Sequence, residues 1–525
     1  MLADTTLIHY VAAALPILAV LILMAVFRWG GHRAGPAGWL TGMIVAALLF
    51  GLNAEVLIVS QAKGVLLSLF VLMVLWPALY VHNIIARARG IEALVGALGR
   101  LIADRDILLI TVAWAFSGML EGFTGFGVPI AVGAPMLVAL GVAPVLAVAA
   151  VAIGHAWSIT FGGLGVIYQT LIAVTRADPV ALVPPAALML GLACLGCGLS
   201  VAMILGQRHH WPRVVIMALV MAFVQYALAS QGITSLASLG AGASGILAGI
   251  VLSRRPALTM SAPHTPPSQT PPSPDDQPSN SRTLVATLVI YGGLVLLMIS
   301  ITLIRPLQSA LAGIMWRPDF PEVTTLSGFV TPAGPGQVFR PLVHPGASLL
   351  LVGTLGLIGL RATGLLQKGD SRAVVRATWH SAGPASVGVF AMVGLSALMD
   401  HCGMTQLLAQ GLSNALGLAF PLVSPLVGVL GAFATGSNNN SNVLFAPLQQ
   451  NVALLLGISP LLLLAAQTAG GAIGSMISPV KILVGAGAVG LRGQDGEVLR
   501  RTVGYALAIS LSLGALVFIL SRTVP

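Results

Sequence analysis

Long apolar runs, separated by short polar stretches, recur along most of this chain. Most runs are about 20 residues long, the length that a helix needs to cross the hydrocarbon core of a bilayer. Outer-membrane strands would instead show short segments of alternating polarity. We therefore predict an all-α polytopic membrane protein. The pattern predicts 12 crossings, at about 8–27, 36–58, 64–84, 144–175, 181–206, 214–231, 233–252, 284–304, 345–361, 380–400, 460–490 and 503–521.

Two further segments, 107–141 and 421–457, are each divided into two half-length apolar arms by a tip of different composition. The first tip reads EGFTGFG from Glu121, and the second reads GSNNNSN from Gly436. A charge and irregular backbone are both costly in lipid unless they line a cavity or lie inside the protein. We therefore predict two re-entrant hairpins, each of which enters and leaves the membrane on one side.

Each predicted hairpin is followed by an interrupted crossing. The span 144–175 contains GHAWSITFGGLG from Gly154, and the span 460–490 is interrupted between Gly470 and Pro479. Glycine and polar residues in mid-span are typical of the broken helices that form binding sites in transporters. Both interrupted spans are therefore predicted to be broken helices.

The two halves of the chain repeat one order of elements: amphipathic segment, half arm, tip, half arm and broken span. Basic residues place the start of the first unit inside and the start of the second unit outside, which predicts an inverted-topology repeat. A shift of 316 residues aligns the units without a gap, placing Glu121 on Ser437, Gly141 on Gly457, Pro144 on Pro460 and Gly154 on Gly470.

The predicted halves are residues 1–253 and 283–525. Between them, residues 254–282 are rich in proline and serine and have almost no apolar content, so they are predicted to form a flexible cytoplasmic linker. The segment 305–344 mixes Trp316, prolines and charges of both signs, which indicates an extramembrane loop or lid.

Composition supports this assignment. The chain is 57% hydrophobic and 8% charged, whereas about a quarter of the residues in soluble domains are charged. The net charge of +10 is spread between the spans, as positive cytoplasmic loops require, and forms no patch for nucleic acid. We predict a multi-pass membrane protein with both termini outside. Cys194 and Cys197 lie within an apolar run that offers no further ligands, so neither a metal nor a cofactor is expected.

Three ionisable residues in the predicted membrane region are candidates for function. Glu121 either is neutralised by a structural partner, with Lys481 as one candidate, or exchanges a proton during transport. His155 lies in the first helix break and is either a packed core residue or a second proton-coupling group. Lys481 either balances the charge of an anionic substrate or extends toward an interface.

The neutral residues of the tips and breaks are candidate substrate ligands. Asparagine and serine also favour ordinary capped turns, but unsatisfied amides between apolar arms are costly. The helix N-termini after the tips, near Val128 and Val443, favour an anion. No nucleophile and base pair stands out, so we do not expect an enzyme. The neutral candidates are Gly122, Thr124, Gly125, Ser158, Thr160, Ser437, Asn438, Asn439, Asn440, Ser441, Asn442 and Ser478.

At these residues the sequence resembles the L-lactate permease family of bacterial transporters. The resemblance lies in EGFTGFGVPIAVGAPMLVALG from Glu121, HAWSITFGGLG from His155, ATGSNNNSNVLFAPLQ from Ala434 and AAQTAGGAIGSMISPVKI up to Ile482. It implies uptake of small monocarboxylates such as lactate or glycolate, coupled to protons. The wider superfamily implies a transport domain that moves like an elevator against a scaffold.

Four positions depart from the family pattern. Asn438 stands where the family has an acidic residue, Ser475 where it has lysine, Lys481 where it has glutamine and His155 where it has asparagine. A different 2-hydroxy acid or a sulfonate-bearing acid is therefore left open as the substrate. Sodium coupling, a passive anion channel and a homodimer are also left open.

Overall fold

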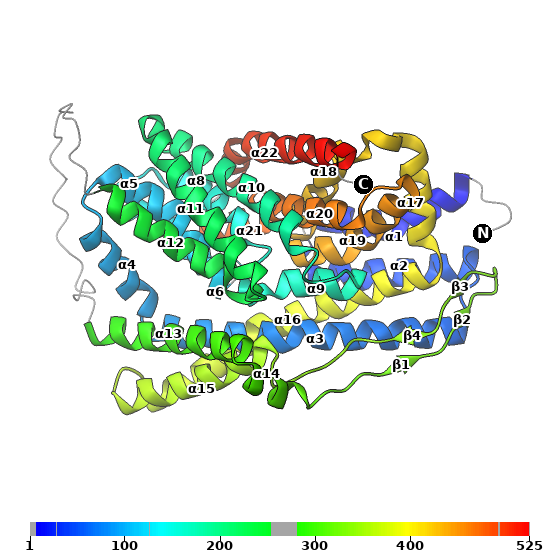
Figure 1. Ribbon diagram of the computed structural model, residues 1–525, viewed down its shortest axis with the longest axis horizontal. Coiled ribbons are helices and arrows are strands. Elements are labelled where there is room, and N and C mark those ends of the chain that lie inside the picture. Colours follow the sequence, from blue (N-terminus) through cyan, green and yellow to red (C-terminus); the bar gives the residue numbers. More distant parts are fainter. Residues whose placement is uncertain (1–6, 28, 125–126, 254–280, 492–493, 524–525) are drawn as a thin grey trace.

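The computed structural model describes residues 7–27, 29–124, 127–253, 281–491 and 494–523. Within these ranges, 13 helical segments are long and apolar enough to cross a membrane. The predicted all-α polytopic fold is confirmed, and Figure 1 shows its long helices running side by side. The predicted linker, up to residue 280, lies outside the described residues.

The first half contains the helices α1 to α12. Their bounds are α1 Leu7–Ala25, α2 Gly31–Leu49, α3 Ala54–Arg87, α4 Gly90–Leu101, α5 Arg105–Ile110, α6 Ser117–Phe123, α7 Val128–Ala139, α8 Pro144–Gly154, α9 Val166–Thr175, α10 Val183–Ile204, α11 Trp211–Ser230 and α12 Ala237–Ser253. A π-helical turn, Thr111–Phe116, joins α5 to α6. Short 3-10 turns lie at Ala156–Ser158, Gly163–Gly165, Arg208–His210 and Thr234–Leu236.

The second half contains the helices α13 to α22. Their bounds are α13 Ser281–Leu303, α14 Arg305–Ala312, α15 Pro345–Ala362, α16 Lys368–His401, α17 Met404–Leu416, α18 Phe420–Thr435, α19 Asn438–Leu456, α20 Pro460–Met476, α21 Pro479–Ala488 and α22 Asp495–Thr523. A 3-10 turn lies at Gly417–Ala419.

The segment between α14 and α15 folds back on itself as a narrow strap, residues 314–344. Strand β1 (Asp319–Phe320) pairs antiparallel with β4 (Gly334–Pro335), and β2 (Val323–Thr324) pairs with β3 (Val330–Thr331). The strap runs along α3 to the turn between α2 and α3, where Leu326 N donates to Gly51 O at 2.7 Å. The predicted loop is therefore an ordered ribbon.

The helices α3 and α16 show that the two units are inverted. Both are 34 residues long, and their first residues, Ala54 and Lys368, lie close to the predicted register of the repeat. Lys63, near the start of α3, contacts His401 at the end of α16, whereas Arg87 at the end of α3 pairs with Asp370 at the start of α16. These equivalent helices are therefore antiparallel, as an inverted repeat requires.

The predicted alignment of the two units also holds in the backbone. Gly141 and Gly457 follow the second arms of the two hairpins, and both have the left-handed conformation that glycine adopts without a steric cost (φ 87° and 66°). Pro144 and Pro460 both begin the next helix. Proline is favoured at this position because the backbone N–H that it lacks would have no partner within the helix. The repeat is therefore structural as well as sequential.

The predicted crossings 36–58 and 64–84 divide the chain at the wrong place. Gly51 is left-handed (φ 66°) and follows the end of α2, and the Asn53 side chain then accepts from Val56 N to cap α3. Asparagine is a favoured N-cap because it satisfies a free backbone N–H. The hydropathy pattern does not indicate this turn, because the residues on both sides of it are apolar.

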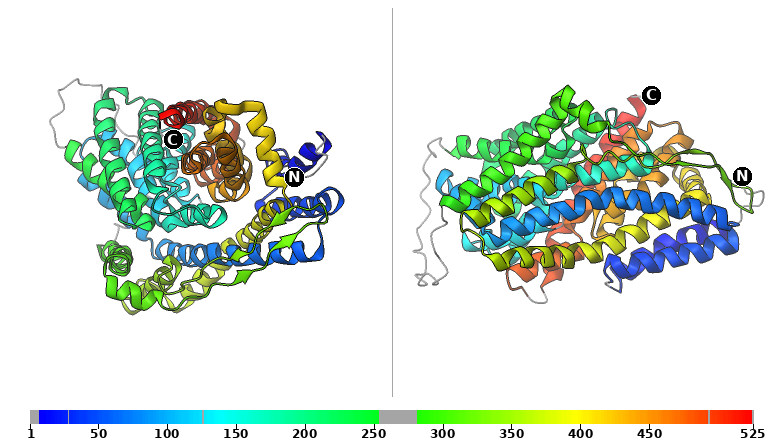
Figure 2. Two further views of the ribbon diagram at one scale, coloured as in Figure 1. Left: turned by 45° about the vertical axis from the view of Figure 1, so that its right-hand side comes forward. Right: turned by 90° about the horizontal axis from the view of Figure 1, so that it is seen from below.

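The long helices lie in two groups. The scaffold layer consists of α2, α3, α13, α15 and α16, and it forms the lower layer of helices in Figure 1. The core group consists of α5 to α12 and α18 to α22 and lies above it. Figure 2 shows the same two groups obliquely in its left view and from below in its right view. The two segments predicted to be re-entrant hairpins and the two broken helices all belong to the core group, and the re-entrant topology stays a prediction.

Candidate functional site

A cavity of about 290 Å³ lies between the scaffold layer and the core group. The scaffold contributes side chains of α2, α3 and α16, including Val71 and Val389. The core group contributes both hairpin tips and both helix breaks. Six of the residues predicted from sequence line this cavity: Glu121, Ser437, Asn438, Asn439, Asn440 and Lys481.

Glu121 reaches the cavity from the first hairpin. It lies on α6, which continues from α5 through the π-helical turn, where the Ser117 hydroxyl donates to Val112 O five residues back. Such turns are frequent at functional sites because they shift the register of the following side chains. The carboxyl group is buried, and its Oε2 has no hydrogen-bond partner among the described residues. This buried oxygen therefore remains available to a proton or a ligand.

The second tip presents the start of α19. Gly436 is left-handed (φ 72°) and ends α18, and the Ser437 hydroxyl then accepts from Asn440 N at 3.4 Å. The capped turn that the sequence allowed is therefore present, but it opens into the cavity. Asn439 is buried there, and its Oδ1 has no partner among the described residues.

Lys481 is positioned by His155. The His155 Nδ1 lies 2.8 Å from Val151 O, and its Nε2 lies 3.4 Å from Lys481 Nζ. A carbonyl oxygen can only accept and an ammonium can only donate, so His155 carries its proton on Nδ1 and accepts from lysine at Nε2. His155 is thus neutral in this arrangement and directs the ammonium group. Its place at the end of α8 brings the first break against the second.

Glu121 and Lys481 line the same cavity without a direct bond. They interact electrostatically, but no ion pair within 4.0 Å joins them in the part of the chain that the structure describes. A closed ion pair would make Glu121 a structural charge, as the sequence left open. The open arrangement leaves space for a small ligand between the two groups.

A buried amide network fixes the second tip to both broken helices. Asn438 Nδ2 donates to Thr468 O at 3.0 Å and to Thr160 Oγ1 at 3.3 Å, and Asn442 Nδ2 donates to Thr468 Oγ1 at 3.0 Å. Thr468 was missed in the sequence, although it follows Gln467 in the middle of an apolar run. Two adjacent polar residues in an apolar run could have indicated a buried polar contact at this position.

The remaining sequence candidates make local contacts instead of lining the cavity. Thr124 donates to Leu120 O, Ser158 to His155 O, and Ser441 to Gly428 O. A side chain at Gly122 would meet the backbone of Leu239, so this glycine allows close packing. Ser478 is buried, with no hydroxyl partner among the described residues, and Gly125 lies outside those residues.

Ser475 is a lining residue that the sequence candidates did not include. It is buried at the end of α20, lines the cavity and has a hydroxyl without a partner among the described residues. Glu121 Oε2, Asn438 Oδ1 and Asn439 Oδ1 are likewise without a partner among the described residues, so four lining residues each have an unsatisfied polar atom. Buried polar groups without partners are costly, so this set favours a polar ligand.

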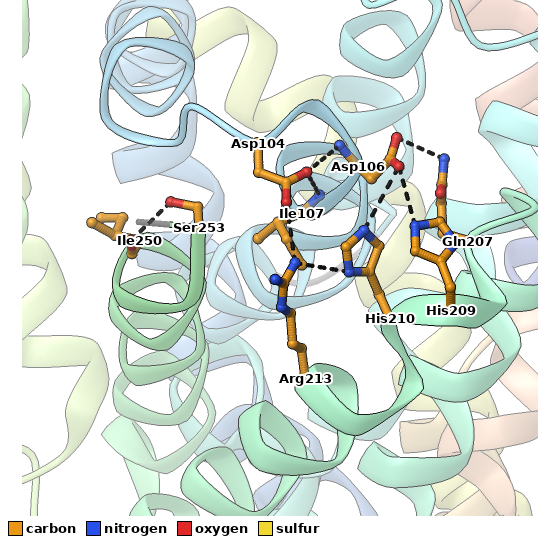
Figure 3. A network of polar contacts seen from close by, with 9 residues as sticks. All are labelled: Asp104, Asp106, Ile107, Gln207, His209, His210, Arg213, Ile250 and Ser253. Carbon is orange, nitrogen blue, oxygen red and sulfur yellow. Dashed lines mark hydrogen bonds and ion pairs between the residues drawn. The ribbon is translucent and has the colours of Figure 1, made fainter. Parts of the chain in front are cut away.

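A second polar cluster joins the start of α5 to the α10–α11 turn (Figure 3). Asp106, His209 and His210 place three potential metal ligands within 4.8 Å of one another. Arg213 Nη1, however, lies 3.0 Å from His210 Nδ1 and 3.2 Å from Asp104 Oδ2. Because arginine only donates, the His210 proton lies on Nε2, toward Asp106, and no lone pair is left there for a metal. This cluster is an ion-pair network that joins two loops.

A family model described as L-lactate permease matches residues 9–524. The chain belongs to the L-lactate permease family. The L-lactate permease of Bacillus subtilis (strain 168) is 26% identical over 556 residues, covering 98% of this chain and 96% of its own length.

One further relative and one solved structure are also similar to this chain. The glycolate permease GlcA of Escherichia coli (strain K12) is 25% identical over 532 residues, covering 96% of this chain and 94% of that protein. The crystal structure of the Alcanivorax borkumensis YdaH transporter, which has an unusual topology, aligns with a TM-score of 0.44 at 17% identity, covering 86% of this chain and 85% of its own. Asn438, Ser475 and Lys481 line the cavity and His155 contacts Lys481, so the four positions at which the resemblance leads us to expect a departure from the family pattern lie together.

Proposed function

We propose that this protein is a secondary active transporter of the inner membrane that imports a small 2-hydroxy monocarboxylate, such as lactate or glycolate, together with a proton. The observation that carries the proposal is the cavity that joins Glu121, Lys481 and the Asn439 amide between two inverted units. Family membership and the names of the permease relatives fit a transporter and not an enzyme.

The carboxylate of the substrate binds toward Lys481. An ammonium group supplies the opposite charge, and the N-terminus of α19 at Asn438 adds the positive end of a 19-residue helix. The Ser475 hydroxyl donates to a carboxylate oxygen, and Asn439 Oδ1 accepts from the 2-hydroxyl group. These groups suit a ligand that combines a negative charge with a neighbouring donor.

Glu121 carries the proton, and the charge of the site explains the coupling. With Glu121 ionised and Lys481 protonated, the empty site is neutral. With a protonated Glu121 and a bound anion, the loaded site is neutral again. Either ligand alone leaves one net charge in a region where charges are costly. Full loading and full unloading are therefore the favoured states for movement, which couples one proton to one anion.

Coupling is also required by the membrane potential. Importing one negative charge against an inside-negative potential costs about 2.3 kcal/mol per 100 mV. A proton that accompanies the anion removes this cost. Under this proposal His155 does not carry the proton, because both of its ring nitrogens are engaged, and its role is to hold Lys481.

The location of the cavity supports alternating access. It lies where the core group meets the scaffold layer, so movement of one group against the other would expose it to each side in turn. We propose that the tips act as re-entrant hairpins that move with the core group, as in an elevator. The orientation of the termini stays a prediction.

The proposal is tested by uptake of labelled L-lactate and glycolate into proteoliposomes under an imposed inward proton gradient. Choline replaces sodium on both sides. The expected result is uphill accumulation that collapses when the gradient is removed by a protonophore. Accumulation that appears only when sodium replaces choline outside would identify a sodium-coupled transporter, and equilibration without accumulation would identify a channel. Transport of a sulfonate but not of a carboxylate would identify a different class of anion as the substrate.

A further inference from the structure

A second, larger cavity of about 1130 Å³ lies along the same helices as the central one. We name it the vestibule. It is lined by α3, α9, α16 and α19 and by the strap. Its residues come from the ends of these helices that the charge distribution predicts to be outside. It is large enough for several small anions with their water.

The vestibule lies next to the central cavity along four shared helices. On α3, Phe70 lines the vestibule and the next residue, Val71, lines the central cavity. On α16, Val393 lines the vestibule and Val389, one turn earlier, lines the central cavity. The helices α9 and α19 also line both cavities. The two cavities are therefore neighbouring compartments along the same helices.

The vestibule repeats the lysine–histidine pair of the central site. His401 Nδ1 lies 2.7 Å from Ala397 O, and its Nε2 lies 2.9 Å from Lys63 Nζ. As with His155, the partners require a proton on Nδ1 and a neutral ring that accepts from the ammonium. In both pairs the carbonyl belongs to the residue four positions before the histidine. The same arrangement thus positions a lysine in each of the two cavities.

The charges of the vestibule favour an anion. Lys63 and Arg176 contribute two positive charges and Asp400 one negative charge, and these three groups interact electrostatically. Neither cation has a carboxylate within 4.0 Å among the described residues: Lys63 contacts His401 and Arg176 donates to Pro335 O at 3.1 Å. Arg317, in contrast, pairs with Asp319 at 3.7 Å and is compensated.

We propose that the vestibule holds a second binding site for a small carboxylate anion, formed by Lys63 and Arg176, at which the substrate waits before it reaches Lys481. Lys63 lies on the scaffold layer and Arg176 follows α9 in the core group, so the site spans both groups. A positive, partly enclosed compartment raises the local concentration of anions and the rate of their capture. The inference rests on the proposed function, because it assigns the same substrate to this site.

The test compares Lys63→Gln/Arg176→Gln with the wild-type protein in initial-rate uptake of labelled L-lactate. Right-side-out and inside-out membrane vesicles are measured at two ionic strengths. The KM is expected to rise about tenfold on one face only, with the maximal rate retained, because steering acts on capture and not on the central site. The dependence of KM on salt on that face should weaken in parallel. Lys63→Arg, which keeps both positive charges, should retain the wild-type KM.

Arg317→Gln is the matched control, because it removes a compensated cation from the same vestibule. Its KM and salt dependence are expected to equal those of the wild-type protein. The proposal is overturned if the double variant behaves like Arg317→Gln, or if its KM rises equally on both faces. Failure of the proposed function would look different, since the wild-type protein itself would then take up no lactate or glycolate.

Discussion

The two inverted units share one architecture but differ in the chemistry of their tips and breaks. The first unit brings ionisable groups, Glu121 on its hairpin and His155 at its break. The second unit brings a tip of neutral amides and hydroxyls, with Lys481 directly after its break. The breaks also differ in length, since the whole segment 155–165 separates α8 from α9 but only 477–478 separates α20 from α21.

The two units therefore share a backbone arrangement but contribute different side chains to the cavity. The long first break lets His155 reach across to Lys481, and the short second break keeps Lys481 close to the Asn438 network. The cavity lies where the two units meet. Under the proposed function, neither unit contains both the proton-carrying group and the oxygen-binding groups, so coupling of proton and anion would be a property of the pair.

Lys481→Gln should have the largest effect, because it removes the cation that the second unit contributes. Truncation of a buried, hydrogen-bonded charge costs about 2–5 kcal/mol of binding, so the Kd for lactate should rise at least about 30-fold. Isothermal titration of purified protein measures this. Lys481→Arg is the control and should retain part of the affinity. A Kd within threefold of the wild-type value would contradict the assignment.

Glu121→Gln should remove proton coupling from the first unit while binding survives. A pH gradient of one unit contributes about 1.4 kcal/mol per proton, which corresponds to a tenfold accumulation of substrate. The variant should accumulate none under this gradient but should still exchange labelled for unlabelled lactate. If gradient-driven accumulation stays at the wild-type ratio, another group carries the proton.

Much of the fold could be predicted because the apolar runs and the alignment of the two units depend on local sequence. The alignment placed Gly141 on Gly457, and both are left-handed. The turn at Gly51 and the polar ends of α3 and α16 could not be placed by hydropathy, because these helices extend to 34 residues through charged positions. Hydropathy measures the cost of contact with lipid and says little about helix length outside it.

The site was predicted less completely because its contacts join distant parts of the chain. Glu121, Lys481 and the second tip stood out as polar residues in apolar surroundings. Thr468 did not, and Ser475 was noted only through the family resemblance, since serine and threonine are common inside membrane helices and only their partners reveal a role. Likewise, no sequence pattern indicates that His155 and Lys481, 326 positions apart, are in contact.

The shared architecture can be tested with a pair of equivalent glycines. A Cβ at Gly154 would collide with Ala113 O, and one at Gly470 would collide with Pro425 O, so each glycine lets a broken helix pack against its own hairpin. Overpacking typically costs about 1–3 kcal/mol, so Gly154→Ala and Gly470→Ala should lower the free energy of unfolding by similar amounts.

Denaturant unfolding in detergent measures these changes. Gly99→Ala and Gly292→Ala are the controls, because nothing lies within 4 Å of a Cβ at either position. They should be neutral or slightly stabilising, since alanine favours helix over glycine. Equivalence of the two units would be refuted if Gly154→Ala destabilised the protein and Gly470→Ala behaved like the controls.

Asn439→Ala should have the smallest effect and should sharpen the assignment of oxygen binding to the second unit. If Asn439 Oδ1 accepts from the 2-hydroxyl group, its loss should cost about 1 kcal/mol, or a fivefold rise in the KM for lactate. The KM for propionate, which lacks the hydroxyl group, should not change. Asn442→Ala is the matched control, because that amide donates to Thr468 and does not line the cavity. If the KM of Asn439→Ala rose equally for lactate and propionate, Asn439 would support the structure of the tip and would not bind the hydroxyl group.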